Sequence, residues 1–454
     1  MKESNKKLFG TDGIRGVANQ YPMTAEVALS LGRALAHVFK NGHRHRRILI
    51  GKDTRLSGYM LEMALASGIC SMGADVLLLG PMPTPGIAFL TSAMRADAGV
   101  VISASHNPFQ DNGIKVFDRY GYKLPDSMEL EIEDIVLSGK IANLRPTAGD
   151  IGKAKRVEEA KGRYIEFVKG TFPKDLNLDG CKIVLDCAHG AAYEIAPIVF
   201  GELGAELICL GVSPNGLNIN QESGALNPER LAAKVKESGA TLGIGLDGDA
   251  DRVVLIDEKG QLIDGDAVIA VCGELLLQQG RLKKNTVVGT LMSNLGLEKY
   301  LNARGAQLIR VPVGDRYIIE EMRKTGFNFG GESSGHMIFF DQSTTGDGMI
   351  AALQVLAIMM TQKKSLSELV SSYYAYPQVL KNIRVKRRED MSLVPTIMKK
   401  IKEVEQSLGD SGRVLVRYSG TEPLIRVMVE GQELQVIDEM SSAIVTTISQ
   451  ALNG

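Results

Sequence analysis

The sequence predicts an α/β protein with three related α/β/α domains, each with a mixed sheet, and a smaller C-terminal α+β domain. Two observations support this fold class. A strand–helix–glycine–strand pattern recurs three times, and each recurrence is followed by two apolar strands that flank a polar loop. With 454 residues, the chain has room for about three or four domains.

The glycines of the recurring pattern precede its second apolar strand. A strand that leads through a helix to another strand is typical of a parallel sheet covered by helices. A glycine just past a helix suits the left-handed conformation in which helices often end. The three glycines and the strands that follow them are Gly73 with Val76 to Leu79, Gly204 with Leu207 to Leu210, and Gly305 with Leu308 to Val311.

The polar loops span residues 103–112, 247–252 and 330–336, and they would converge if the three units pack around one cleft. A break rich in Ser, Tyr and Pro near Ser371 to Pro377 precedes the last module. Its predicted strands are Val414 to Arg417 and Ile425 to Val429. The predicted domains are 1–157, 158–258, 259–370 and 376–454.

Composition argues against a nucleic-acid or membrane partner. The 52 basic and 53 acidic side chains give a formal net charge of −1, so no global field attracts a polyanion. The longest apolar segment, Met349 to Met360, is too short to span a bilayer and reads as a buried helix. The polar N-terminus lacks the apolar core of a signal peptide, and the odd set of five cysteines suits reduced thiols. We expect a cytoplasmic protein.

The loop with Asp247, Asp249 and Asp251 gives the strongest local signal. Three carboxylates at alternate positions repel one another unless a cation or solvent intervenes, and Mg²⁺ prefers oxygen ligands of this kind. A solvated acidic turn is the alternative. The loop with Ser103, Ser105 and His106 offers a hydroxyl that could act as nucleophile or phosphate carrier, against the alternative of a hydrogen-bonded turn.

Further loops carry groups suited to a phosphosugar. The pair Asn112–Gly113 predicts a tight turn that returns Lys115 towards the serine loop. Gly331 to Gly335 matches the nucleophile elbow of hydrolases, but a strand and not a helix follows. Glu332 and Ser334 are therefore assigned to sugar hydroxyls, with a glycine-rich turn as the alternative.

The C-terminal module has a loop suited to a phosphate that is not transferred, because two guanidinium groups and two hydroxyls can bind a dianion. A surface hairpin with incidental arginines is the alternative. Near the N-terminus, Arg15 lies in another glycine-framed loop, Phe9 to Gly16. The C-terminal candidates are Arg417, Ser419, Gly420, Thr421 and Arg426.

These loops, in this order and over nearly the whole chain, resemble the α-D-phosphohexomutase superfamily. The stretches Phe9 to Gly16 and Val313 to Tyr317 look like its phosphoglucosamine branch. Ser333 departs from the sugar-loop pattern, at a position that varies between branches. The resemblance implies four domains about a central cleft, often in a homodimer.

The resemblance also implies the roles of the site residues. Ser105, and not Ser103, would carry the phosphoryl group, and a phosphate oxygen on it would complete a Mg²⁺ site. The three aspartates of the acidic loop would supply the other ligands. The residues around the transferred group would be Arg15, Lys115 and His336.

The implied reaction interconverts glucosamine 6-phosphate and glucosamine 1-phosphate through a phosphoserine enzyme and glucosamine 1,6-bisphosphate, a step towards bacterial cell-wall amino sugars. The alternatives are a phosphomannomutase or phosphoglucomutase with the same residues, a phosphatase that uses Asp247, and a catalytically silent sugar-phosphate sensor.

Overall fold

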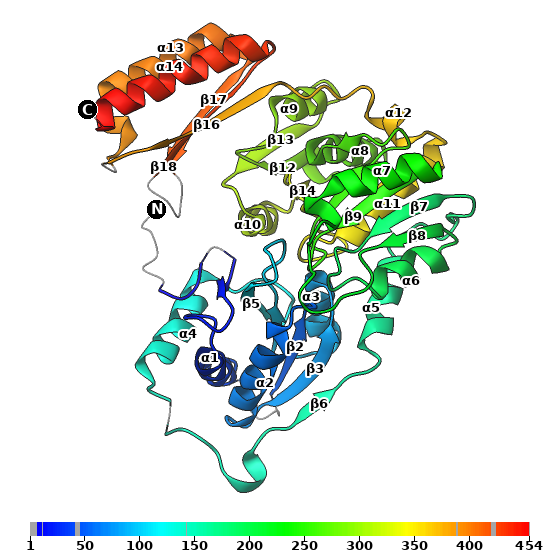
Figure 1. Ribbon diagram of the computed structural model, residues 1–454, viewed down its shortest axis with the longest axis vertical. Helices are drawn as coiled ribbons and strands as arrows, with labels where there is room; N and C mark the ends of the chain where they lie inside the picture. The colour runs from blue at the N-terminus through cyan, green and yellow to red at the C-terminus, as the bar shows by residue number, and fades with distance from the viewer. Residues whose placement is uncertain are drawn as a thin grey trace.

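The computed structural model describes residues 7–10, 12–40, 46–141, 143–386, 389–418 and 424–453. These residues form four sheets, each within one segment of the sequence. Figure 1 shows the first unit at the bottom in blue, the second and third in green and yellow, and the C-terminal unit at the top left in orange and red. The fold class predicted from the sequence is confirmed.

The first sheet has six strands in the order β1-β5-β4-β2-β3-β6. β2 is parallel to β3 and β4, whereas β5 is antiparallel to both β1 and β4. Helices cover both faces, since alternate residues of β2 belong to different hydrophobic clusters. The elements are β1 Ile14–Val17, α1 Ala25–Val38, β2 Arg47–Lys52, α2 Ser57–Cys70, β3 Asp75–Pro81, α3 Thr84–Ala93, β4 Ala98–Ile102, β5 Asp111–Asp118, α4 Asp126–Ser138 and β6 Ala154–Arg156.

The second sheet has the order β11-β10-β9-β7-β8. β7 is parallel to β8 and β9, and β10 returns antiparallel to β9, so the Asp247 loop lies between β9 and β10. The elements are α5 Ala160–Lys169, β7 Lys182–Asp186, α6 Ile195–Glu202, β8 Glu206–Leu210, α7 Pro228–Ser238, β9 Leu242–Leu246, β10 Val253–Ile256 and β11 Leu262–Ile263.

The third sheet repeats this plan in the order β13-β12-β14-β15, with the Glu332 loop between the antiparallel β14 and β15. The elements are α8 Gly265–Gln278, β12 Thr286–Thr290, α9 Leu295–Asn302, β13 Gln307–Val311, α10 Asp315–Thr325, β14 Phe329–Gly331, β15 Met337–Phe339, α11 Gly348–Gln362 and α12 Leu366–Val370. The apolar segment Met349 to Met360 is confirmed as a mostly buried helix, α11.

The C-terminal unit is an antiparallel sheet, β16-β18-β17, packed against two helices. Arg413 joins it to the third unit, because its guanidinium donates to the carbonyl oxygens of Leu291 and Ser293 at 3.0 and 2.9 Å. The elements are β16 Gln378–Arg384, α13 Pro395–Leu408, β17 Arg413–Tyr418, β18 Leu424–Glu430 and α14 Leu434–Asn453.

The recurring glycines have the backbone that the pattern predicts, with φ of +76° at Gly73, +102° at Gly204 and +84° at Gly305. Two local predictions are wrong. Asn112 and Gly113 form no turn, because both lie inside β5, and the chain reverses earlier, between Ala104 and Gln110. The segment around Arg15 includes a strand, β1, that pairs with β5.

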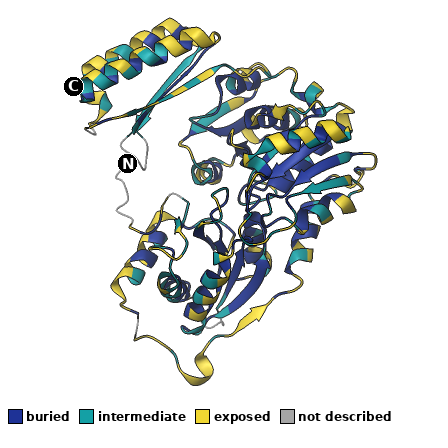
Figure 2. Cartoon of the chain, in the orientation of Figure 1, coloured by how far each residue is buried: buried dark blue, intermediate teal, exposed yellow. Residues whose placement is uncertain are grey.

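Buried residues fill the centre of each sheet and line the region where the first three units meet (Figure 2). One hydrophobic cluster runs from β3 and α3 of the first unit through the second and third units to α11, so these units share a continuous core. The C-terminal unit has a separate core. Within the described residues, no helix combines the length and the apolar character needed to cross a membrane.

Candidate active site

Ser105 lies in the loop between β4 and β5, where the first unit meets the second. Its side chain is 2% exposed, and its hydroxyl donates to Asp247 Oδ2 at 2.7 Å, across the junction between the two units. Its φ of +50° is in the left-handed region, which residues with a side chain seldom adopt. Such a conformation persists where surrounding contacts impose it, often at functional sites.

Those contacts come from both units. Arg55 and Asn220 donate to the carbonyl oxygen of Ser105 at 3.2 and 2.9 Å, and both also donate to that of Asn107. Arg55 is fully buried and paired with Asp53. The acidic loop approaches so closely that a Cβ at Gly248 would lie 2.6 Å from the Ser105 carbonyl oxygen. Contacts within the protein therefore hold the backbone of the serine loop in place.

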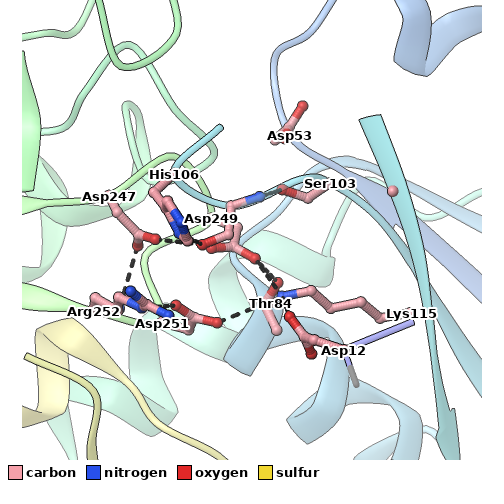
Figure 3. Close-up of polar contacts among 12 residues, drawn as sticks. Asp12, Asp53, Thr84, Ser103, His106, Lys115, Asp247, Asp249, Asp251 and Arg252 are labelled. Atoms are coloured by element: carbon pink, nitrogen blue, oxygen red, sulfur yellow. Dashed lines mark hydrogen bonds and ion pairs between the residues drawn. The ribbon is translucent and has the colours of Figure 1, made fainter. Parts of the chain in front are cut away.

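The three aspartates converge in Figure 3 beneath the serine loop. Carboxylate oxygens of Asp247, Asp249 and Asp251 lie within 4.8 Å of one another, and all three residues are buried. One oxygen of Asp249 and one of Asp251 have no hydrogen-bond partner although they are buried. Because buried carboxylate oxygens are rarely left unpaired, this donor set fits a hard divalent cation.

Burial and the proximity of Asp251 and Asp249 raise the pKa of Asp247 well above its ordinary value. Burial also raises the pKa of Asp251, but Lys115 and His336 outweigh it and lower that pKa. Carboxylates in one site can thus differ in protonation because their neighbours differ. A bound cation would favour the ionised form of all three.

Lys115 on β5 is the cation that faces the acidic loop. Its Nζ lies 3.1 Å from Asp249 Oδ2, 3.6 Å from Asp251 Oδ2 and 3.1 Å from Asp12 Oδ2. Burial lowers its pKa, but these carboxylates outweigh burial and raise it. Lys115 therefore stays charged beside Asp12, Asp249 and Asp251. Thr84 also donates to Asp249 Oδ2, at 2.7 Å (Figure 3).

The third loop adds His336 to the same cluster. Its Nδ1 lies 3.7 Å from Asp251 Oδ1 and its Nε2 lies 3.5 Å from Asp315 Oδ2. Burial lowers the pKa of His336, but Asp251, Asp315 and Glu332 raise it. Glu332 is buried and accepts from the backbone N–H of Gly314 at 3.0 Å, whereas Ser334 is exposed.

The other predicted residues lie apart from this cluster or outside the described chain. Arg15 on β1 forms an ion pair with Asp12, which links it to Lys115. Arg417 and Arg426 face each other across β17 and β18, both partly exposed. Burial and Arg426 lower the pKa of Arg417. Ser419, Gly420 and Thr421 lie outside the described residues.

Sequence reasoning missed several residues that complete the site. Asp12 and Asp315 lie inside the two stretches that resemble the phosphoglucosamine branch. The sequence pattern therefore included both residues, but it assigned no role to either. Lys123, Arg55 and Asn220 had no signal, because their pairing depends on tertiary contacts between segments far apart in sequence.

Four domain profiles match the chain in order. They are described as phosphoglucomutase/phosphomannomutase alpha/beta/alpha domain I at residues 6–142, domain II at 162–260, domain III at 264–376 and the C-terminal domain at 380–447. A phosphoglucosamine mutase of Syntrophotalea carbinolica is 60% identical, over 98% of each chain. The chain belongs to the phosphoglucosamine mutase family.

Other members are similarly close. The phosphoglucosamine mutase of Geobacter sp. strain M21 is also 60% identical, over 99% of each chain. Solved structures share the family fold at lower identity. A phosphoglucomutase/phosphomannomutase family protein from Burkholderia thailandensis has a TM-score of 0.81 at 23% identity, with 98% of this chain and 97% of that one covered. An N-acetylphosphoglucosamine mutase from Aspergillus fumigatus, solved with GlcNAc-6P and magnesium, has a TM-score of 0.67 at 17% identity, with 98% and 96% covered.

Proposed function

We propose that this protein interconverts glucosamine 6-phosphate and glucosamine 1-phosphate, with Ser105 as phosphoryl carrier. One observation carries the assignment of the carrier: the Ser105 hydroxyl donates to Asp247 at 2.7 Å, inside a buried cluster that also holds Lys115. Membership of the phosphoglucosamine mutase family supports the choice of sugar.

The serine loop is suited to holding a reactive group in a fixed place. Arg55 and Asn220 clamp its backbone from two units, so the hydroxyl does not need to be ordered during the reaction. Catalysis of phosphoryl transfer depends mainly on such alignment and on neutralising the charge that develops on the phosphoryl oxygens. Lys115 and Arg15 would supply positive charge beside the transferred group.

Asp247, Asp249 and Asp251 would hold Mg²⁺, and the ion would polarise the phosphoryl oxygens when bound. The buried oxygen of Asp249 that has no hydrogen-bond partner supports this assignment. The family relation and the magnesium in the Aspergillus fumigatus structure are consistent with it.

The reaction requires two transfers. In the first, the bond between Ser105 Oγ and phosphorus breaks as a sugar hydroxyl bonds to that phosphorus and loses its proton, and the released Ser105 Oγ takes up a proton. In the second, Ser105 Oγ loses its proton and bonds to the phosphorus of the other phosphate of glucosamine 1,6-bisphosphate, while the bond between that phosphorus and the sugar oxygen breaks and the sugar oxygen takes up a proton. Phosphoserine is regenerated, and the product carries the phosphate on the other carbon.

The sugar must reverse between these transfers, so the distal site has to accept either end. Arg417 and Arg426, with Ser419, Gly420 and Thr421, are proposed to bind the phosphate that is not being transferred. Glu332 and Ser334 are proposed to bind sugar hydroxyls, and His336 to assist proton transfer beside Asp251.

Under this proposal each loop belongs to its own domain. Residues 1–157 hold the phosphoserine loop, 158–258 the metal loop, 259–370 the sugar loop and 376–454 the distal phosphate loop. The proposal further places the protein in the cytoplasm, where sugar phosphates are metabolised.

The test is phosphorus NMR of the purified protein with Mg²⁺ and a trace of the matching sugar bisphosphate. Glucosamine, glucose and mannose 6-phosphates are offered separately. Fastest formation of glucosamine 1-phosphate supports the proposal. Preference for glucose or mannose would change the substrate, release of inorganic phosphate alone would indicate a phosphatase, and no turnover would indicate a sugar-phosphate sensor.

A further inference from the structure

Six charged side chains form a closed ring that shares Asp251 and Lys115 with the candidate site, with a carboxylate and a cationic or basic group in alternation. Each neighbouring pair approaches within 4 Å. The ring draws on all three α/β units, since its members come from the first, second and third sheets or their loops. In ring order the members are Asp12, Lys123, Asp315, His336, Asp251 and Lys115.

Lys123 is opposite Asp251 in the ring order, and it has no place in the reaction described above. Its Nζ donates to Asp12 Oδ1 on one side and to both oxygens of Asp315, at 2.9 and 2.7 Å, on the other. Its side chain is 12% exposed. It therefore lies between a carboxylate of the first unit and a carboxylate of the third.

Both of those carboxylates contact a proposed catalytic group on their far side. Asp12 Oδ2 lies 3.1 Å from Lys115 Nζ, and Asp315 Oδ2 lies 3.5 Å from His336 Nε2. Lys123 thus acts on the two groups that flank Asp251 without touching either. Without its charge, Asp12 and Asp315 would repel each other and draw Lys115 and His336 away from Asp251.

The backbone holds Lys123 in this place from both directions. An isolated bridge pairs Lys123 with Phe117 on β5, the strand that also carries Lys115. The preceding residues dock on the third unit: Thr344 donates to the Gly121 carbonyl oxygen at 2.7 Å, and the Tyr122 ring packs against Phe340. The Lys123 side chain is therefore presented to Asp315 by a docked segment.

We infer that Lys123 is a positioning residue for phosphoryl transfer. It joins Asp12 to Asp315 and so fixes Lys115 and His336 on either side of Asp251 when the first and third units are together. The inference rests on the proposed function, because Lys115 and His336 matter to the rate only if the site transfers a phosphoryl group.

A matched control is present in the same contact between units. Arg316 pairs with Asp126 at 2.6 Å and with Glu129 at 3.6 Å, so it also joins the third unit to the first, but it is not part of the ring. Arg316→Met removes a comparable interunit ion pair and leaves the ring intact. Lys123→Met removes the positive charge between Asp12 and Asp315 and keeps a similar side-chain length.

The experiment measures kcat and KM of the full-length Mg²⁺-loaded enzyme for the phosphosugar that the wild type turns over fastest. We expect Lys123→Met to lower kcat about 30-fold, the size typical of a lost charged hydrogen bond, with KM changed less than about threefold. Arg316→Met should keep kcat within about threefold, because its ion pairs are with Asp126, Glu129 and Glu320, which lie outside the ring. Lys123→Arg should recover most of the rate, because it keeps the charge.

Binding of Mn²⁺ as a probe, followed by electron paramagnetic resonance, gives a readout besides activity and should be unchanged in Lys123→Met. If that variant does not fold, Lys123→Gln keeps a donor of similar length and should show the same loss in kcat. The inference is overturned if the folded Lys123 variant keeps wild-type kcat, if Arg316→Met loses as much, or if Mn²⁺ binding is lost. No turnover by the wild type with any phosphosugar would overturn the proposed function and this inference with it.

Discussion

Two regions of the molecule are rich in charged groups but arrange them differently. One is the serine centre, the buried cluster of Ser105, Lys115, Asp247, Asp249 and Asp251, and the other is the pair Arg417 and Arg426 in the C-terminal unit. At the serine centre most charged groups have a partner of opposite charge and are buried. In the C-terminal unit, Arg417 and Arg426 are like charges at directly opposed positions of two strands, and both are partly exposed. Like charges in that arrangement disfavour each other.

The difference in charge pairing and burial indicates a different role for each region. A buried network of paired charges holds its geometry before substrate arrives, so it can stabilise a transition state without reorganisation. Among the described residues no carboxylate forms an ion pair with Arg417 or Arg426, so a bound anion would supply their counter-charge. Substitutions at the first region should therefore change kcat, and substitutions at the second should change KM.

The largest effect is expected from Ser105→Ala. Removal of the carrier oxygen should lower turnover on the order of 10⁴-fold or more, as for other nucleophiles. The fold should persist, because the loop is held through the backbone of Ser105 and Asn107. Steady-state kinetics with a thermal melt as control measures this, and turnover near the wild-type rate would place the carrier elsewhere.

The second-largest loss of activity is expected from Asp249→Asn. Asp249 accepts from Thr84 and Lys115 through one oxygen, and its other oxygen is buried and unpartnered. Loss of its charge should lower kcat about 100-fold and raise the Mg²⁺ concentration needed for half-maximal activity. A Mg²⁺ titration indistinguishable from that of the wild type would remove Asp249 from the metal site.

Arg426→Gln should have a smaller and different effect. It removes one of the two cations proposed for the distal phosphate, so we expect KM to rise about tenfold with kcat within about threefold. Lys381→Gln, in the same sheet but paired with the exposed Asp438, is the control for damage to the domain. A loss confined to kcat in Arg426→Gln would contradict the contrast between the two regions.

The smallest expected effect concerns Asp266, a buried carboxylate of α8 near the C-terminal unit. Burial raises its pKa to about 7, against the effect of a hydrogen bond from the Asn294 N–H. Its protonated form is favoured in the folded state, so stability is retained at low pH and lost as pH rises through 7. The melting temperature of Asp266→Asn relative to the wild type should rise by a few degrees between pH 5 and 8, on the order expected for one such group. No change in that difference across the range would contradict the assignment.

Much of the fold follows from the sequence because its signals are local. Apolar strands and left-handed glycines specify the three units, and Gly73, Gly204 and Gly305 all have positive φ. The wrong turn at Asn112–Gly113 shows the limit, since pairing with β1 keeps those residues in a strand. That strand pairing overrides a turn preference.

The candidate site is less accessible from sequence alone. The acidic triad could be predicted because its spacing is local, and the structure brings its carboxylates together. The ion pairs of Lys123 with Asp12 and Asp315 could not, because they join segments more than 100 residues apart. Such contacts depend on how the units pack, which no local pattern encodes.

The most direct test of the account is peptide mass spectrometry of the wild-type enzyme after incubation with Mg²⁺ and glucosamine 1,6-bisphosphate. We expect one added phosphoryl group, located on Ser105 and removed when excess glucosamine 6-phosphate is supplied. Phosphate on Asp247, or turnover with no phosphate on Ser105 at any time, would contradict the central claim.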